Sequence, residues 1–223
     1  MAQKNNDYKI ILIGDSAVGK TSIFKKISSG TFFDRNISTI GMDKRTLNFK
    51  DIKVEINGKE STEDFNIILY DTAGQERYRA ITKNYFQGSD IVLILYDITN
   101  RKSFEDVESW LESLSEILSS WKTAQYSIML FGNKLDIANS EEKPREIEEE
   151  EAEKLCHDKG IKWGGECSVK EYSVEKLTEI LINSWKIHVQ NFGIKTEISS
   201  QNKMEGSKYI SKNKPKKKSC RKI

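Results

Sequence analysis

Residues Gly14-Asp15-Ser16-Ala17-Val18-Gly19-Lys20-Thr21 fit the phosphate-binding pattern G-x-x-x-x-G-K-[ST]. The glycines allow the backbone to approach a polyphosphate and to aim N–H groups at it, with a helix N-terminus behind them. Lys20 is expected to reach the β- and γ-phosphates, and the Thr21 hydroxyl is expected to hold Mg²⁺. The predicted phosphate-binding residues are Asp15, Ser16, Ala17, Val18, Gly19, Lys20, Thr21 and Ser22.

The sequence on either side of this loop is that of a strand and a helix. Residues 8–13 form an apolar run typical of a buried strand, and residues 21–27 carry apolar side chains at helical spacing. A plain strand–turn–helix with a surface lysine is the alternative to a phosphate site. The loop indicates a nucleotide phosphate, but it leaves open the base and whether the protein is a switch, a kinase or a motor.

Length and composition suit one domain with a tail. The chain has 223 residues, of which 37% are hydrophobic, and no apolar run reaches the length that a transmembrane helix needs. Residues 1–7 lack the apolar region of a signal peptide. The three cysteines show neither metal-ligand spacing nor a disulfide framework, so a reducing compartment is expected. His157 and His188 are expected on helix surfaces, without a catalytic role.

Strands alternate with helices along the rest of the chain. Asn57-Gly58 is a hairpin signal between two partly apolar segments, and uninterrupted apolar runs predict strands covered on both faces. The predicted strands cover 45–56, 65–70, 91–96, 126–131 and a short segment from 161. The predicted helices begin at the N-cap Ser103, cover 146–159 with a solvated acidic start, and cover 174–192.

This alternation predicts an α/β fold of the P-loop NTPase class. We expect a six-stranded, mostly parallel sheet with one antiparallel hairpin strand and five flanking helices. The expected parts of the chain are a disordered N-terminus over 1–7, the domain over 8–192, and a disordered polybasic tail over 193–223. Ligands of such sheets lie beyond the carboxyl ends of the strands, where the remaining motifs fall.

Residues Asp71-Thr72-Ala73-Gly74-Gln75-Glu76 follow the third strand. A carboxylate at this strand end, near Lys20, can bind Mg²⁺ through water. The Gly74 N–H can meet a γ-phosphate, and Gln75 can orient an attacking water. A capping residue at a strand–loop junction is the alternative role for Asp71.

A second polar motif, Asn133-Lys134-Leu135-Asp136, follows the fifth strand. An aspartate can accept hydrogens from N1 and the 2-amino group of guanine, whereas adenine lacks that pair of donors. A polar turn is the alternative. After the sixth strand, Ser168-Val169-Lys170 would close the base pocket. The predicted base-binding residues are Asn133, Lys134, Asp136, Ser168, Val169 and Lys170.

These motifs, in this order, resemble those of the Ras-superfamily small GTPases, and the branch that they resemble most is Rab. The resemblance covers residues 8–192. The matching stretches are 37–43, similar to ISTIGVD, 70–78, similar to WDTAGQERF, 85–88, similar to YYRG, and 95–99, similar to VYDIT.

The resemblance implies roles that spacing alone does not give. Thr39 would ligate Mg²⁺ and sense the γ-phosphate, and Phe32 would pack edge-on against guanine. Lys134 would lie over the base, Asp136 would read it, and the Val169 N–H would meet the guanine carbonyl.

The implied function is a Mg²⁺-dependent GTP/GDP switch with slow GTP hydrolysis, acting in vesicle trafficking. Water held by Gln75 would attack the γ-phosphate, with Lys20 and with Mg²⁺ on Thr21, Thr39 and Asp71 stabilising the developing charge. No arginine finger is evident in the chain, so an activating protein is implied. A nucleotide-bound scaffold with negligible hydrolysis and another P-loop kinase or ATPase are the alternatives.

Expected partners are an exchange factor, an activating protein and effectors. They would bind switch I, the segment that contains Thr39, switch II, the segment that contains Gln75, and the interswitch hairpin between them. Lys44 stands where Rabs usually have Phe, and Tyr70 where they usually have Trp. With Tyr85 these positions form the aromatic effector surface of the family. The hairpin around residues 50–64 is also longer than usual, which indicates either a changed partner surface or a tolerated loop insertion. Val169 replaces the usual alanine.

The tail is strongly basic, whereas the rest of the chain is mildly acidic. Residues 194–223 contain ten Lys or Arg against two Glu, so an anionic membrane surface is the expected partner. Cys220 lies four residues from the end, the position of prenylation, although Arg221 and Lys222 are not aliphatic. A solvated basic tail is the alternative, and no nucleic-acid partner is expected. The protein is predicted to be cytoplasmic and peripherally bound to the cytosolic face of intracellular membranes.

Overall fold

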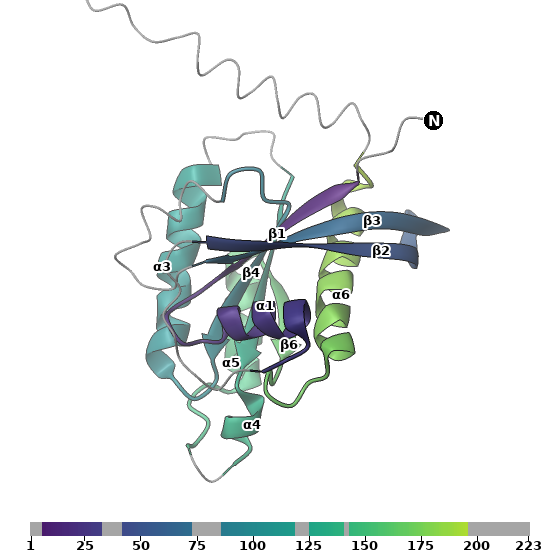
Figure 1. Cartoon of the computed structure of the whole chain (residues 1–223). Helices are drawn as coiled ribbons and strands as arrows, with labels where there is room; N and C mark the ends of the chain where they lie inside the picture. Colours follow the sequence, from purple (N-terminus) through teal and green to yellow (C-terminus); the bar gives the residue numbers. More distant parts are fainter. Residues whose placement is uncertain (1–5, 33–41, 73–85, 119–124, 141–142, 196–223) are drawn as a thin grey trace, which may run out of the picture. The chain divides into compact units, whose positions relative to one another are not determined.

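The computed structural model describes residues 6–32, 42–72, 86–118, 125–140 and 143–195, and residues 7–193 form one compact unit (Figure 1). Its elements are β1 (Asp7–Ile13), α1 (Lys20–Ser29), β2 (Met42–Ile56), β3 (Lys59–Thr72), β4 (Ile91–Asp97), α3 (Arg101–Leu118), β5 (Ser127–Asn133), α4 (Leu135–Ala138), α5 (Glu149–Lys159), β6 (Lys162–Glu166) and α6 (Val174–Phe192).

The strands form one six-stranded sheet in the order β2-β3-β1-β4-β5-β6. β2 and β3 are antiparallel, and every other neighbouring pair is parallel. This arrangement confirms the predicted fold class. Because β1, β3, β4, β5 and β6 run in one direction, their carboxyl ends meet at the same edge of the sheet.

Helices cover both faces of the sheet, and Figure 1 shows α3 and α6 on either side of the strands. Every residue of β4 is buried, as expected for a strand covered on both faces. One core lies under α3 and α5 and includes Trp110 and Tyr96. On the other face, Phe65 of β3 stacks on Trp185 of α6, with ring centroids 3.7 Å apart.

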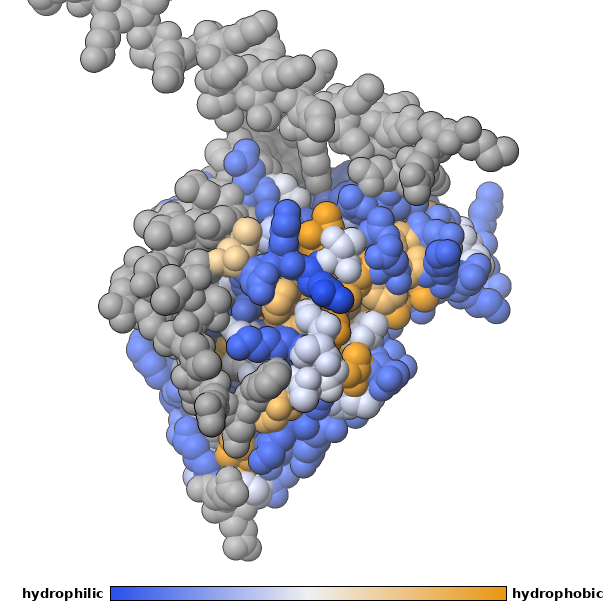
Figure 2. Space-filling model, in the orientation of Figure 1, coloured by the Kyte–Doolittle hydropathy of each residue, from blue (hydrophilic) through white to orange (hydrophobic). Residues whose placement is uncertain are grey.

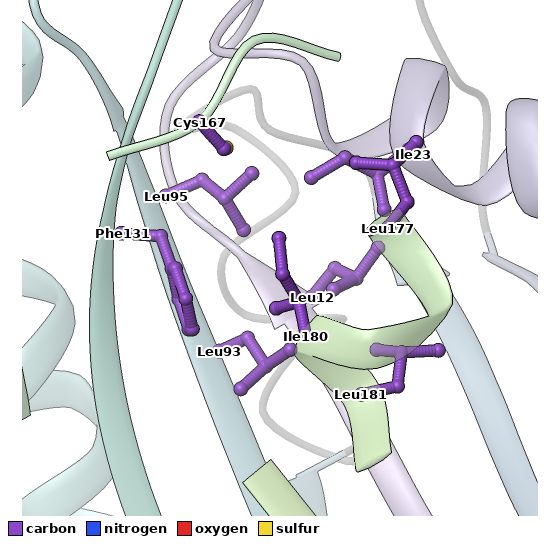
Figure 3. A pocket seen from close by; sticks show the side chains of 9 residues that line it. All are labelled: Leu12, Ile23, Leu93, Leu95, Phe131, Cys167, Leu177, Ile180 and Leu181. Carbon is purple, nitrogen blue, oxygen red and sulfur yellow. The ribbon is translucent and has the colours of Figure 1, made fainter. Parts of the chain in front are cut away.

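Packing between α6 and the sheet leaves one narrow apolar cavity, shown in Figure 3. Its volume of about 10 Å³ is that of a single water molecule, and its lining offers no charged group. An apolar cavity of this size stays dry, so it is a packing gap and not a ligand site. The lining residues come from β1, α1, β4, β5, α6 and the segment after β6: Leu12, Ile23, Leu93, Leu95, Phe131, Cys167, Leu177, Ile180 and Leu181.

The interswitch hairpin is a continuous β-ribbon that contains one bulge. Asn57 and Gly58 both have positive φ, 52° and 74°, as a two-residue hairpin turn requires. Between the pairs Phe49–Phe65 and Ile52–Glu63, β2 contains one extra residue. Asp51 takes a φ of 55° there, and its N–H donates to Asp64 at 2.9 Å. The segment predicted as a possible loop insertion is therefore ordered strand.

This bulge decides which side chains of the hairpin face α6. Without the extra residue, side-chain alternation would turn Val54 away from the face that Phe49 occupies. With it, Val54 lies on that face and is 4% exposed, while α6 contacts β2. In Figure 2 the outer surface of the hairpin is mostly hydrophilic, with a few apolar residues between.

Several boundaries and two residue assignments differ from the prediction. Asp7, placed in a disordered N-terminus, begins β1 and accepts a hydrogen bond from Asn66. α5 begins three residues later than predicted. α3 begins at Arg101, so Ser103 is not its N-cap. The Ser103 hydroxyl instead accepts from the Asp97 N–H at 3.0 Å and fixes the turn after β4.

His188 is the clearest error, because it is buried and not on a helix surface. It is 3% exposed, its Nδ1 lies 3.2 Å from the Ser127 hydroxyl, and its ring packs against Tyr8. The face of α6 that meets the sheet is wide enough to include this position. His157 is exposed, as predicted. In the part of the chain that the structure covers, no helix has the length and apolar character to cross a membrane.

Val54→Ala should destabilise the protein if the hairpin extension belongs to the folded domain. Removing two buried methyl groups costs about 1–2 kcal/mol. The exposed neighbour Glu55 is the matched control, and Glu55→Ala should change the free energy of unfolding by less than about 0.5 kcal/mol. Denaturant unfolding with saturating Mg²⁺ and GDP measures both. Equal effects of the two substitutions would contradict the burial of Val54 against the domain.

Candidate nucleotide site

The loop between β1 and α1 has the backbone shape of a phosphate cradle. Gly14 and Gly19 have φ of 131° and 106°, and Ala17 has φ of 64°. A Cβ on Gly14 would lie 2.2 Å from the Leu95 carbonyl oxygen, and one on Gly19 would lie 2.1 Å from the Asn133 amide nitrogen. Both positions therefore require glycine, for space as well as for conformation.

Lys20 begins α1 and its ammonium is buried in the loop. Nζ donates to the carbonyl oxygens of Gly14 and Asp15, at 2.8 and 2.5 Å. Burial lowers the pKa of Lys20 to about 8, against the opposing effect of the Asp71 and Asp15 carboxylates. A buried ammonium gains most from an anionic ligand, because a ligand of opposite charge offsets its lost hydration.

Asp71 and Thr21 meet at the end of β3. The Thr21 hydroxyl donates to Asp71 Oδ2 at 2.7 Å, while Asp71 Oδ1 is buried and has no hydrogen-bond partner among the residues that the structure describes. Burial raises the pKa of Asp71 to about 6, although the Thr21 hydrogen bond and Lys20 lower it. The pair places one carboxylate and one hydroxyl oxygen side by side.

These two oxygens suit a hard cation such as Mg²⁺. Mg²⁺ prefers hard oxygen ligands and is usually held by one or two carboxylates together with substrate phosphates. Within residues 6–32, 42–72, 86–118, 125–140 and 143–195, no group of three or more His, Cys, Asp or Glu could hold a metal by itself.

Asn133, at the end of β5, joins the phosphate loop to the segment after β6. Its Nδ2 donates to the Val18 carbonyl at 2.7 Å, and its Oδ1 accepts from the Val169 N–H at 3.2 Å. One buried side chain thus sets the distance between the loop after β1 and the loop after β6.

Lys134 and Asp136 are held by partners from other loops. Lys134 has a φ of 70°, and its Nζ lies 2.8 Å from Asp97 Oδ2. Although burial acts in the opposite direction, hydrogen bonds from Lys134 and Thr99 keep the pKa of Asp97 below its usual value. The Ser168 hydroxyl donates to Asp136 Oδ1 at 2.7 Å, which orients that carboxylate.

Three supports of this site are missing from the sequence prediction, and the first is Lys26. Lys26 of α1 donates to the carbonyls of Val169 and Lys170, at 2.8 and 3.0 Å, and its Nζ lies 5.8 Å from the centre of the Phe32 ring. No pattern in α1 distinguishes this lysine from its neighbour Lys25.

The other missed supports are Asp97 and the pair Arg145–Glu166. Asp97 ends β4 at the ligand-binding edge, so the strand-end argument applied to Asp71 could have found it. Arg145 donates to both carboxylate oxygens of Glu166, at 2.5 and 2.8 Å. This ion pair fixes the end of β6 directly before Cys167 and Ser168, a role that depends on tertiary contact.

The structure thus places predicted residues from the loops after β1, β3, β5 and β6 at one edge of the sheet. Other predicted residues lie in segments that the structure does not describe. Ser16 and Ala17 are exposed on the loop, Ser22 is half-buried in the first turn of α1, and Lys170 is exposed. Thr39, Gly74, Gln75, Tyr85 and Cys220 lie outside the described residues.

Comparison with known proteins identifies the family. The Ras family matches residues 9–186. The chain is 40% identical over 162 residues to the Ras-related protein Rab-8A of Bos taurus and of Mus musculus, and to Rab-8B of Homo sapiens. Each match covers 72% of this chain and 70% of the relative.

This membership decides against the kinase, ATPase and inactive-scaffold alternatives, and it implies exchange factors, activating proteins and effectors as partners in general. The chain belongs to the Ras family as a Rab-like small GTPase, which binds GTP and GDP with Mg²⁺, hydrolyses GTP, and acts as a switch in vesicle trafficking.

Proposed function

We propose that the loops after β1 and β3 form the phosphate and metal half of the GTP site. The N–H groups of residues 15–22 bind the phosphates, and Lys20 neutralises charge on the β- and γ-phosphates. Thr21 and Asp71, with Thr39, would hold Mg²⁺, which when bound offsets the negative charge of the phosphates. The observation that carries this proposal is the pair of buried charged groups, Lys20 and Asp71, beside the Thr21 hydroxyl, with Asp71 Oδ1 lacking a hydrogen-bond partner among the described residues.

The loops after β5 and β6 form the base half of the site. Asp136 accepts hydrogen bonds from guanine N1 and the 2-amino group, and Ser168 holds the carboxylate for this purpose. Lys134 and Phe32 pack against the base, and the backbone of Val169 and Lys170 closes the pocket. Asn133 keeps this half at a fixed distance from the phosphate loop.

Hydrolysis uses an in-line water. Gln75 orients the water toward the γ-phosphate, and Lys20 together with the loop N–H groups stabilises the charge that develops. Loss of the γ-phosphate frees Thr39 and Gly74, so the two switch segments relax and partners can distinguish the two states.

Effectors bind the switch segments and the adjoining face of β2 and β3. On this face Lys44 pairs across the strands with Tyr70, and Lys9 Nζ lies 4.7 Å from the centre of the Tyr70 ring. One ammonium group over the Tyr70 ring, with a second lysine opposite it in the ladder, favours a partner with acidic side chains at this point. The hairpin beyond the bulge adds a rigid surface to the same side of the molecule.

The basic tail attaches the protein to the cytosolic face of an intracellular membrane. Each lysine near an anionic surface contributes about 1 kcal/mol. A single lipid on Cys220 anchors weakly, so the polybasic segment is the second signal that stable attachment requires. Mass spectrometry of the chain made in eukaryotic cells tests whether Cys220 carries a prenyl group.

Asp136→Asn should remove most of the preference for guanine. A site built to accept two hydrogens discriminates strongly, so the affinity for GDP should fall by at least about 100-fold. Affinity for XDP, which has an oxygen in place of the 2-amino group, should rise relative to GDP. Competition binding with GDP and XDP measures the change, and Glu150→Gln on the exposed side of α5 is the control. An unchanged guanine preference would show that Asp136 does not read the base.

Asp71→Asn should stabilise the nucleotide-free protein above pH 6. The pKa of Asp71 is raised from 3.8 to about 6, so between these values the native state binds more protons than the unfolded state. Stability therefore falls as pH rises through this window. The shift corresponds to about 3 kcal/mol at neutral pH, which asparagine relieves.

Urea unfolding of EDTA-treated protein between pH 4 and 8 measures this effect. The variant should also lose the extra stability that Mg²⁺ and GDP give to the native protein. Asp158→Asn, at an exposed position of α5, controls for the change in net charge. A variant that is less stable than the native protein at pH 7 would argue against a costly buried carboxylate at Asp71.

Replacing Lys216, Lys217 and Lys218 by Gln should weaken binding to anionic vesicles. The expected loss is about 3 kcal/mol in all, seen by co-sedimentation with vesicles containing phosphatidylserine at low salt. The matched control replaces three exposed lysines of the domain, Lys143, Lys154 and Lys162. If both triple variants bind alike, the tail is not the membrane-binding segment.

A further inference from the structure

Trp110 makes a polar contact that the GTPase site described above does not use. It lies on α3, is 1% exposed, and its indole Nε1 donates to Asp15 Oδ1 at 2.8 Å. Asp15 is the second residue of the phosphate loop. The helical spacing of apolar residues in α3 predicts only a core position for Trp110. The hydrogen bond to Asp15 is therefore a second role besides packing.

The phosphate loop needs supports because its conformation is costly. Gly14, Ala17 and Gly19 all take positive φ, and Ala17 does so at 64° without being glycine. Contacts from outside the loop lower the cost of keeping this shape ready for a ligand. Two such contacts come from side chains of the sheet and of α3: Asn133 on the Val18 carbonyl and Trp110 on the Asp15 carboxylate.

The contact also settles where the Asp15 carboxylate points. A carboxylate facing bound phosphates would repel them, whereas one held against α3 keeps its charge at the outer side of the loop. The Asp15 carbonyl meanwhile accepts from Lys20 Nζ at 2.5 Å. Fixing the side chain of Asp15 therefore also fixes the backbone oxygen that positions Lys20.

A second tryptophan provides a contrast within the same chain. Trp185 of α6 is also fully buried, but its Nε1 has no hydrogen-bond partner in the described residues, and it stacks on Phe65 on the other face of the sheet. The two residues share ring size and burial. They differ in the bond to the phosphate loop.

We propose that Trp110 is a positioning residue of the nucleotide site, whose N–H holds Asp15 and thereby the phosphate loop in its binding conformation. This proposal rests on the assignment of residues 15–22 as the phosphate cradle. α3 thus connects the core of the domain to the loop, and a displacement of α3 would be transmitted to bound nucleotide through one hydrogen bond.

Trp110→Phe and Trp185→Phe form the test, because both remove an indole from a buried site and only the first removes the bond to Asp15. Full-length protein is loaded with tritiated GDP and Mg²⁺, and release is followed by filter binding in excess unlabelled GDP. A radiolabel is needed because tryptophan removal would disturb a fluorescence signal. Hydrogen bonds to charged groups predict about tenfold faster release for Trp110→Phe, and less than about twofold for Trp185→Phe.

A double-mutant cycle separates positioning from a general loss of stability. Asp15→Ala should accelerate release about as much as Trp110→Phe, and the double variant should add nothing further. Equal release rates for the two Trp→Phe variants, or additive effects in the cycle, would overturn the proposal. Lys20→Ala serves as the reference for the site. If it retains GDP like the native protein, the cradle assignment itself is wrong.

Discussion

The side-chain amide of Asn133 is the contact on which the nucleotide site depends. It donates to the phosphate loop at Val18 and accepts from the base loop at Val169. Gly19 lies so close to it that a single Cβ would be 2.1 Å from its nitrogen. The glycine of the loop motif and the asparagine of the base motif are thus one structural unit, although 114 positions of sequence separate them. These two hydrogen bonds of Asn133 set the distance between the phosphate half and the base half of the site.

Buried charge gives the site its affinity for a charged ligand. Lys20 and Asp71 are both almost fully buried. Burial lowers the pKa of Lys20 and raises the pKa of Asp71, so it favours the neutral form of each group. A buried ammonium and a buried carboxylate lower the stability of the protein when no ligand is bound. Phosphate and a divalent cation relieve both costs at once. The low dielectric that makes the charges costly also strengthens their interaction with a ligand.

The opposite end of the sheet is built from apolar contacts. Tyr8, Phe65 and Trp185 pack edge-to-face and stacked between β1, β3 and α6. The β-bulge at Asp51 extends this packing along the hairpin, because it returns Val54 to the side that faces the helix. The long interswitch hairpin is thereby packed against the domain as continuous strand.

The sequence by itself determined the fold class, the order of strands and helices, and most residues at the ligand edge. These follow from local patterns: the loop glycines, the apolar run of β4, and polar motifs at strand ends. Tertiary structure alone decided the burial of His188, the true start of α3 at Arg101, and the supports from Lys26, Trp110 and Arg145. The burial of His188 and these supports depend on contacts between segments far apart in sequence, and helical or strand periodicity carries no information about such contacts.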